Sequence, residues 1–506
     1  MKRYKKANEG IHAPEEAKVK AARPAGKPSR ARWMGAVAAM LAVVILGGVA
    51  LRPRQPNVTG PLSLDGPGVP VGREVSPARA FTLAAAVYPE MAPYPNEKDY
   101  ISPDTWEYDY DRHSEDYSAW LESRDALRSG TDYTGMLDGF LSASTARFLV
   151  DAGEENRVYS PLNVYMALSM LAETAGGNSR QQLLDLLQAD SVETLRTRAS
   201  ALWRDNYRDD GVATSVLANS LWLRSGMTYS QEVLDTLAAD YYASSFSGEM
   251  GSEEYNQALR DWLNEQTGGL LKEQADGLSM NPSTVLALAS TIYFKAAWSD
   301  EFSKDCTERD VFHAPAGNVE TDFMHRSRQG AYYWGEHFAA VQLEFQEGGS
   351  MWLILPDEGT GPDDLLATGE AMDFLLTNKY HYNDSKFLTV NLSMPKFDVS
   401  SDLDLIGGLK ELGVTDIFDG AASNFDPLGA STDEALYVST ARHAARVKVD
   451  EEGCEAAAYT VIMIDGATAI AFGDEVDFIL DRPFLFAITG DSGLPLFTGV
   501  VNQPNG

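Results

Sequence analysis

Cysteine is nearly absent from this chain of 506 residues, which contains only Cys306 and Cys454. Two cysteines cannot form a disulfide framework, and the sequence leaves open one bridge or two free thiols.

Basic residues are scarce after residue 54. Residues 1–54 hold 12 Lys and Arg against 3 Asp and Glu, a net charge of +9, whereas residues 55–506 hold 29 against 71, a net charge of −42. A body this acidic repels phosphate backbones, so we exclude a nucleic-acid partner.

Sequence motifs of common enzymes and repeat proteins are also absent. There is no internal repeat, no HExxH zinc string and no G-x-S-x-G nucleophile elbow, and we expect neither a cofactor nor a metal site. Apolar residues, in contrast, are plentiful: 44% of the chain is hydrophobic and 10% is aromatic. This composition supports a large core and excludes disorder throughout the chain.

One uncharged segment lies near the N-terminus. Residues 33–51 are 19 residues without a charge, which as a helix span roughly 28 Å, nearly the thickness of a bilayer core. Ten Lys and Arg lie in residues 1–32, so the positive-inside rule predicts a cytoplasmic basic tail and an extracellular acidic body. We interpret residues 33–51 as a single-pass signal-anchor in the cell membrane. A cleaved signal peptide, which would leave a secreted protein, is the alternative. A buried helix of a folded domain fits less well with the basic, proline-containing flanks.

The chain after this segment divides into two parts. Residues 52–135 are rich in proline, glycine, tyrosine and acids, which predicts an extracellular spacer with local structure late in the stretch. Residues 136–506 have the pattern of a folded domain. Helical periodicity comes first, and a helix is predicted to start at Ser160-Pro161, with serine capping and proline in the first turn. Short apolar runs and period-two patterns follow, so the fold class is α+β with a largely antiparallel or mixed sheet system.

Six local strings in this domain occur in the order found in one family. They are VYSPLNVYMALSMLAETAGGNSRQQL, NQALRDWLNEQTGGLL, TIYFKAAWSDEF, MPKFDVSSDLDLIGGLKELGVTDIF, VDEEGCEAAAYT, and RPFLFAIT with LFTGVVNQP. Residues 136–506 therefore resemble the serpins, a family of serine protease inhibitors, and we expect a bacterial-type member. The resemblance implies a serpin fold with three β-sheets, about eight or nine helices and an exposed reactive-centre loop near the C-terminus. It also implies suicide inhibition of a peptidase and not an enzymatic activity.

The segment from Glu451 to Phe472, EEGCEAAAYTVIMIDGATAIAF, has the properties of a strand that can enter a sheet. It contains no proline, so every backbone N–H can join a ladder. Residues 454, 456, 458, 460, 462 and 464 form an uncharged alternate set that begins with small side chains, while Glu455 and Asp465 belong to the other set. Such a set suits a strand that slides between two strands packed over a core. An ordinary strand followed by a turn at Asp465-Gly466 is the alternative.

The resemblance assigns roles along this segment. The implied loop hinge consists of Glu451, Glu452, Gly453, Cys454, Glu455, Ala456, Ala457 and Ala458. By the family's spacing the reactive bond is Ala467–Thr468, and the small residue before the cut favours elastase-like or subtilisin-like targets. A cut at Thr468 or Ala469 is also conceivable. The implied partner is a serine or cysteine peptidase, held as a covalent acyl-enzyme. Cys454 stands where the family prefers Ser or Thr, and we interpret it as a small isostere.

The resemblance also implies a buried polar cluster beneath the main sheet that controls strand opening. Its members in this chain are Ser160, Asn163, Ser290 and His443. The family's second serine and its asparagine are exchanged here as Asn163 and Ser290, which can preserve the number of donors and acceptors. We therefore expect these two side chains to contact each other. Trp298 matches the aromatic residue at the point where the loop enters the sheet.

Two alternative functions are weaker. A non-inhibitory serpin would act as a binding or scaffold protein, but the small residues 456–458 argue against it. A trypsin-like serine peptidase is suggested only by the string Gly490-Asp491-Ser492-Gly493. Leu494 follows this string, no histidine has the matching context, and the string lies between two apolar runs. We therefore predict that it forms a hairpin turn.

Overall fold

The computed structural model describes residues 77–504, except residues 270, 273, 274, 276 and 283 and the segments 430–435 and 455–473. The predictions for the basic tail, for the segment 33–51 and for the first part of the spacer concern residues outside this description. None of the helices in the described part of the chain combines the length and the hydropathy that a membrane span requires.

Helices dominate the first part of the fold, as the periodicity predicts. The α-helices of the described residues are α2 (Tyr110–Leu127), α3 (Asp138–Leu149), α4 (Pro161–Thr174), α5 (Gly177–Leu186), α6 (Val192–Asn206), α7 (Gln231–Asp240), α8 (Glu253–Gln266), α10 (Pro362–Ala367), α11 (Glu370–Leu376) and α12 (Leu405–Glu411). Short 3₁₀ turns are η1 (Pro77–Phe81), η2 (Glu97–Tyr100), η3 (Lys304–Cys306), η4 (Lys379–His381), η5 (Asp416–Phe418) and η6 (Asp426–Leu428).

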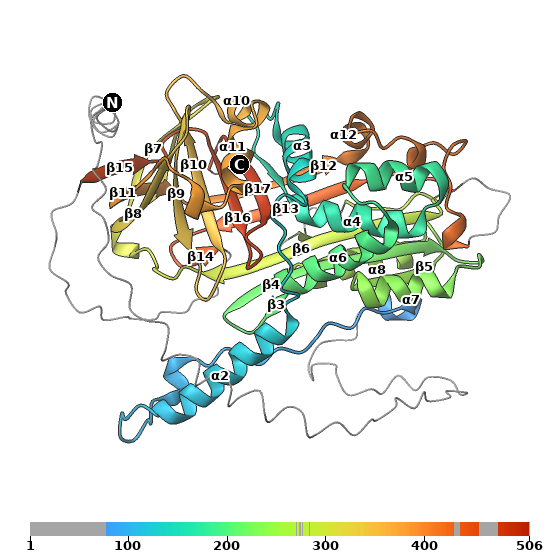
Figure 1. Ribbon diagram of the computed structural model, residues 1–506, viewed down its shortest axis with the longest axis horizontal. Coiled ribbons are helices and arrows are strands. Elements are labelled where there is room, and N and C mark those ends of the chain that lie inside the picture. The colour runs from blue at the N-terminus through green and yellow to red at the C-terminus, as the bar shows by residue number, and fades with distance from the viewer. Residues whose placement is uncertain are drawn as a thin grey trace, which may run out of the picture. The chain divides into compact units, whose positions relative to one another are not determined.

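The strands of the described residues form two hydrogen-bonded sheets (Figure 1). The eight-stranded sheet has the order β1 (Thr82–Ala84), β5 (Ala243–Gly248), β4 (Ala213–Arg224), β6 (Leu286–Ala297), β14 (Gly453–Cys454), β13 (Arg442–Val449) and β12 (Phe397–Asp404), with β3 (Arg208–Asp209) on β4. The nine-stranded sheet has the order β15 (Glu475–Ile479), β11 (Ser385–Pro395), β8 (Gly317–Trp334), β9 (Phe338–Glu344), β10 (Ser350–Pro356), β16 (Phe484–Thr489), β17 (Pro495–Val501) and β2 (Arg157–Tyr159), with β7 (Thr307–Ala314) on β8.

The predicted third sheet is joined to the second through one long strand. Strand β8 pairs with β7 and β11 over most of its length, and its last residues, Tyr332 to Trp334, pair with β9. Because β8 pairs with β7 and β11 and also with β9, the strands of the second and third predicted sheets are continuous in one nine-stranded sheet. The predicted α+β class is confirmed.

Helix α4 lies at the centre of the core. All 14 of its residues are buried, and it contacts β17 of one sheet and β4 and β6 of the other. A helix enclosed on every side is expected to be apolar all round, so its few polar residues must find partners inside the protein. Pro161 occupies the first turn as predicted, but the side chain of Ser160 makes no capping hydrogen bond. That part of the prediction is wrong: the backbone of Ser160 is fixed by a hydrogen bond from its N to His443, and its buried hydroxyl has no partner among the described residues.

Residues 77–134, called the N-terminal arm below, fold together with the body. They belong to the same compact unit, whereas the sequence pattern predicted a spacer over residues 52–135. Strand β1 extends the eight-stranded sheet by pairing with β5. Trp120 on α2 is fully buried, and its Nε1 donates to Asp210 Oδ2 at 3.0 Å. The difference arises because aromatic side chains carry enough apolar area to hold a proline-rich and acidic stretch against a neighbouring surface.

Candidate functional site

The chain turns back into the eight-stranded sheet directly after β13. Strand β13 ends at Val449, and a turn closed by a hydrogen bond from Asp450 N to Gly453 O, 3.1 Å long, leads into β14. Within β14, Gly453 pairs with Ala297 and Cys454 pairs with Ala296, both on β6. Cys454 also pairs with Val449 on the other side. The first two residues of the loop segment that follows the turn are thus already part of the sheet, between β6 and β13.

Trp298 holds this turn in place, at the position where the resemblance put the loop entry. Its indole Nε1 donates to Asp450 O at 2.9 Å, and its backbone N donates to Glu452 O at 3.0 Å. The indole ring stacks on Phe345 with 4.8 Å between ring centroids and an interplanar angle of 10°. Because it binds the turn by two hydrogen bonds and is itself stacked and buried, Trp298 gives the hinge a rigid base.

Two glutamates anchor the turn from the other side. The carboxylate of Glu451 is buried, accepts a hydrogen bond from Thr307 Oγ1 at 2.9 Å and forms an ion pair with Lys396 at 3.1 Å. Burial opposes the charge, but hydrogen bonds from its own backbone, Thr307 and Lys396 outweigh it and hold the pKa of Glu451 below its ordinary value. Glu452 is paired with Lys304 at 2.5 Å. Both hinge glutamates therefore act as charged anchors.

Glycine is required at position 453 by a close approach of two backbones. A Cβ atom added to Gly453 would lie 2.3 Å from Ala296 O and 2.9 Å from Ala297 Cα. Backbone atoms cannot withdraw as the end of a flexible side chain can. The predicted hinge glycine therefore has a packing role, which the sequence alone did not indicate.

We expect Gly453→Ala to lower the free energy of unfolding by about 1–3 kcal/mol, because the new methyl group overlaps β6. Urea unfolding measures this change. Gly407→Ala in α12 is the matched control, since a Cβ there meets nothing within 4 Å; alanine in a helix should add about 0.5–1 kcal/mol at such a site. Equal tolerance at both positions would contradict the packing role.

Beyond Cys454, the described residues contain no strand paired between β6 and β13, and this interval is called the gap below. Strand β6 pairs with β4 from Leu286 to Ala296, but toward β13 its pairings in the described part of the chain are limited to those with β14. A cavity of about 120 Å³ lies here, lined by residues of α8, β6 and β13 that include Leu263, Leu288 and Ala444. The inner side of the space between β6 and β13 is apolar. It can therefore accept a further strand whose inward side chains are small or apolar.

The polar cluster lies behind β6, between that strand and α4. Ser290 Oγ lies 2.7 Å from Asn163 Oδ1, so the predicted contact between these two side chains is confirmed. Ser290 Oγ is also 2.7 Å from Oδ1 of Asn219 on β4. The Ser290 hydroxyl has only one proton, so it can donate to only one of these two amides. The other amide can make a hydrogen bond by turning its NH₂ group toward the Ser290 oxygen, which then accepts. Asn219, a buried polar residue in an apolar strand pattern, was missed because a strand pattern does not reveal which polar groups meet behind it.

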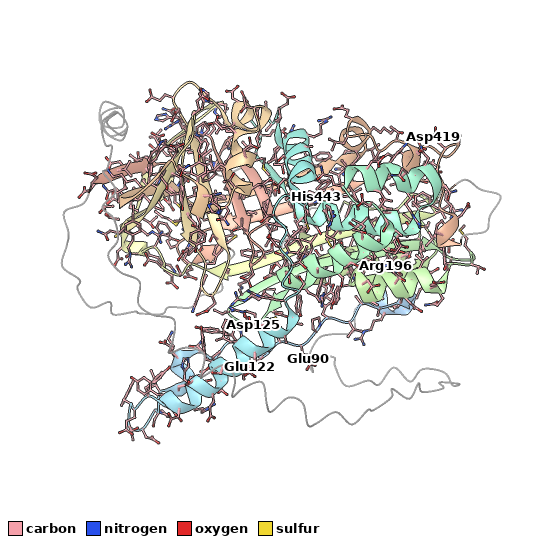
Figure 2. All side chains as sticks on the ribbon, in the orientation of Figure 1. Glu90, Glu122, Asp125, Arg196, Asp419 and His443 are labelled. Atoms are coloured by element: carbon pink, nitrogen blue, oxygen red, sulfur yellow. The ribbon has the colours of Figure 1, made fainter. Side chains whose placement is uncertain are left out.

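His443 forms the other part of the cluster. It is buried on β13 (Figure 2), and its Nε2 accepts a hydrogen bond from the backbone N of Ser160 at 3.0 Å. Accepting this bond requires the neutral ring. Burial lowers the pKa of His443 to about 4, and the charge of Asp402 opposes this shift only weakly. The cluster thus joins α4 to strands on both sides of the gap, through Ser290 on β6 and His443 on β13.

We expect Asn163→Ser to lower the free energy of unfolding by about 1–3 kcal/mol, because the Ser290 hydroxyl loses a buried partner. Adding Ser290→Asn should restore most of the loss, since the pair then carries the same groups in exchanged positions. Urea unfolding of the two single variants and the double variant gives the coupling energy. Additive effects of the two substitutions would contradict the exchange.

The enzyme-like string lies in a turn. Residues 490–493 connect β16 and β17, as the hairpin prediction required. The hydroxyl of Ser492 donates to Asn206 Oδ1 at 2.8 Å, so it is held by an amide and not activated by a histidine.

Both cysteines are within the described residues, and no disulfide joins them. The predicted hinge residues 455–458 and the reactive bond Ala467–Thr468 lie outside the described residues.

The fold and the hinge together define an α+β protein in which Gly453 and Cys454 pair between β6 and β13 of the eight-stranded sheet. The chain belongs to the serpin family: the family model described as "Serpin (serine protease inhibitor)" matches residues 140–504. The description of the family is that of a protease inhibitor in general, and it names no enzymatic activity. The N-terminal arm, residues 77–134, lies wholly before the matched region.

Individual relatives agree with this assignment. Serpin-Z1C of Triticum aestivum is 30% identical over 375 residues, which are 72% of this chain and 93% of the relative, and Serpin-Z2A of the same species is 29% identical over 378 residues, which are 72% and 94%. Among solved structures, the thermophilic serpin tengpin in its native state is 25% identical, with a TM-score of 0.66 over 74% of this chain and 96% of that one. Its latent state gives a TM-score of 0.61 at 24% identity, over 74% and 99%.

Proposed function

We propose that this serpin is a suicide-substrate inhibitor of serine endopeptidases, and of cysteine endopeptidases that use the same acyl chemistry. The observation that carries the proposal is the two-residue strand β14. It occupies one end of the gap between β6 and β13, while the rest of the gap has no paired strand in the described residues. The loop residues that follow Cys454 in the sequence are the nearest candidates to continue this strand.

The inward positions of such a strand match the gap in size and polarity. Cys454 is 3% exposed, and the residues of the same alternate set begin with Ala456 and Ala458. Small side chains can pass between two strands without displacing the core, and the apolar residues further along the set would then cover the cavity. The two charged residues of the other set would face away from the core. This agreement supports insertion and argues against a non-inhibitory role.

The chemistry would proceed as an interrupted hydrolysis. The peptidase nucleophile attacks the carbonyl carbon of Ala467, the peptide bond to Thr468 breaks, and the new amine leaves with a proton while Ala467 stays esterified to the enzyme. Insertion then carries Ala467 along the sheet. Thirteen residue steps from Cys454 correspond to roughly 43 Å at about 3.3 Å per step. Loss of oxyanion-hole alignment during this displacement slows deacylation by about 10²–10³, which leaves the ester trapped.

The experiment is incubation of the purified protein with elastase-like, trypsin-like and subtilisin-like peptidases, followed by denaturing electrophoresis and mass determination. We expect an adduct that survives denaturation and a released C-terminal peptide that begins at Thr468, most readily with the elastase-like or subtilisin-like enzyme. A peptidase inactivated beforehand at its nucleophile is the control and should give no adduct. Cleavage without an adduct, and without a gain in thermal stability, would contradict inhibition and favour a non-inhibitory serpin.

We also propose that residues 33–51 anchor the serpin domain at the outer face of the cell membrane. The support is the uncharged length of the segment and the basic residues before it. The anchored protein should stay with membranes after an alkaline wash, and Val43→Arg with Val44→Arg should release it. A secreted product whose N-terminus lies after residue 51 would replace the anchor by a cleaved signal peptide. The plant relatives give no support to the expectation of a bacterial-type member.

A further inference from the structure

The N-terminal arm reaches the same end of the eight-stranded sheet as the loop hinge. At its first end, Phe81 packs on Tyr255 of α8 with 5.0 Å between ring centroids, and β1 pairs with β5. At its other end, α2 lies near the start of β4 (Figure 1), where Trp120 is hydrogen-bonded to Asp210. The arm therefore follows the sheet from its edge to the region beside β14.

A buried ion pair sits under α2. Arg208 Nε donates to Asp210 Oδ2 at 2.7 Å, and Trp120 Nε1 donates to the same oxygen at 3.0 Å. Arg208 and Asp210 are 5% and 3% exposed, so removal of a partner would leave a charge uncompensated in the interior. Asp210 Oδ1 accepts from Ala213 N at 3.0 Å, and Ala213 pairs with Ala296, the residue opposite Cys454. One line of contacts thus runs from the arm to the hinge through β4.

A second line of contacts runs through the turn between β9 and β10. The hydroxyls of Tyr94 and Tyr117, both in the arm, donate to the two carboxylate oxygens of Glu347 at 3.1 and 3.4 Å. Burial and the neighbouring Glu347 charge raise the pKa of both phenols, so they remain donors. The adjacent Gln346 N donates to Ala297 O at 2.9 Å, and Ala297 pairs with Gly453. Both lines therefore end at the two β6 residues that hold β14.

The arm is also fixed to parts of the protein outside the eight-stranded sheet. Arg128, which follows α2, forms an ion pair with Asp491 in the turn between β16 and β17. Asp205 on α6 accepts hydrogen bonds from Ser129 Oγ at 2.5 Å and from Tyr133 OH at 2.7 Å. Movement of β6 away from β13 would carry β4 with it, because the two strands pair along their length. Such movement would strain the arm, which binds the start of β4 and the neighbouring turns at once.

We propose that the N-terminal arm is an intramolecular clamp that resists further separation of β6 from β13 beyond β14 and so limits how fast the reactive loop inserts without a peptidase. The proposal rests on the proposed function, because it assumes that this loop can insert. It assigns a regulatory role to a part of the chain that lies before the serpin match.

The test uses the full chain with Tyr94→Phe and Tyr117→Phe together, which removes both hydroxyls that bind Glu347 and keeps both rings. Tyr110→Phe is the matched control, since Tyr110 is on the same helix and 76% exposed. Hydrogen exchange followed by mass spectrometry reports opening of β6 through peptides of residues 286–297. We expect exchange there to be roughly tenfold faster in the double variant, because each lost bond was made to a charged group, and unchanged in the control.

Spontaneous loop insertion is the second readout, measured as the first-order appearance of a heat-stable form whose loop resists cleavage. The double variant should convert roughly tenfold faster than the wild type. Glu347→Gln is a further variant, which keeps the acceptor but not its charge and should give a smaller increase. Unchanged exchange in residues 286–297 overturns the clamp, whatever the adduct test gives. Faster exchange without any adduct from the wild type would leave the clamp standing and overturn the inhibitory function.

Discussion

Replacing Cys454 by arginine should convert the protein from an inhibitor into a substrate of its target peptidase. Cys454 is 3% exposed and pairs with strands on both sides, so its side chain faces a closed interior. A guanidinium at this point would have to lose its hydration without a partner, which costs several kcal/mol. Insertion would then lose the competition with deacylation. We expect the number of inhibitor molecules consumed per trapped peptidase to rise by at least roughly tenfold, since each 1.4 kcal/mol is a factor of ten.

Titration of a fixed amount of active peptidase measures this number directly. Two controls separate burial from a general effect of substitution. Cys454→Ser keeps the size and should leave the number unchanged. Glu455→Arg introduces a guanidinium in the other alternate set, which would face away from the core in an inserted strand. Full inhibition by Cys454→Arg would show that insertion of the loop does not require a buried, uncharged side chain at position 454. Loss of inhibition by all three variants would point to damage of the fold and not to the gap.

Much of the fold could be predicted from local patterns. The short apolar runs expected after the helical part include the residues of β9 and β10, and the string at residues 490–493 became a hairpin turn. These predictions worked because burial of one strand face and turn chemistry are local properties of the sequence. The contact between Asn163 and Ser290 was also predicted, but only because an exchange of two residue types could be compared with a family pattern.

What could not be predicted depends on distant parts of the chain that meet. The N-terminal arm has proline and acidic residues of a spacer, yet Trp120 finds Asp210 90 positions later in the chain. No local pattern indicates that Arg208 and Asp210 form a buried ion pair, or that Asp210 also accepts a hydrogen bond from the indole of Trp120. Ser160 stands directly before a helix, where serine usually caps, but its side chain makes no capping bond and its backbone N donates to His443 on a distant strand. Local propensity was overruled at each of these places by a partner remote in sequence.

The protein should lose stability as the pH falls from about 6.5 to 4, in part through His443. The unfolded chain protonates this residue near pH 6.5, whereas burial lowers the pKa in the folded protein to about 4. Between these values the unfolded state binds more protons, so the free energy of unfolding decreases as the pH is lowered, and it levels off below pH 4. Above pH 6.5 His443 is neutral in both states and has no effect. The lowered pKa corresponds to about 3 kcal/mol over this window.

Carboxylates titrate in the same range, so the measurement is a difference: urea unfolding of the wild type and of His443→Gln at several pH values from 7 to 4. The variant, which has no titrating group at this position, should lose about 3 kcal/mol less than the wild type across the window. Parallel curves would mean that the pKa of His443 is the same in the folded and the unfolded protein, so that neither burial nor the hydrogen bond from Ser160 N keeps the ring neutral.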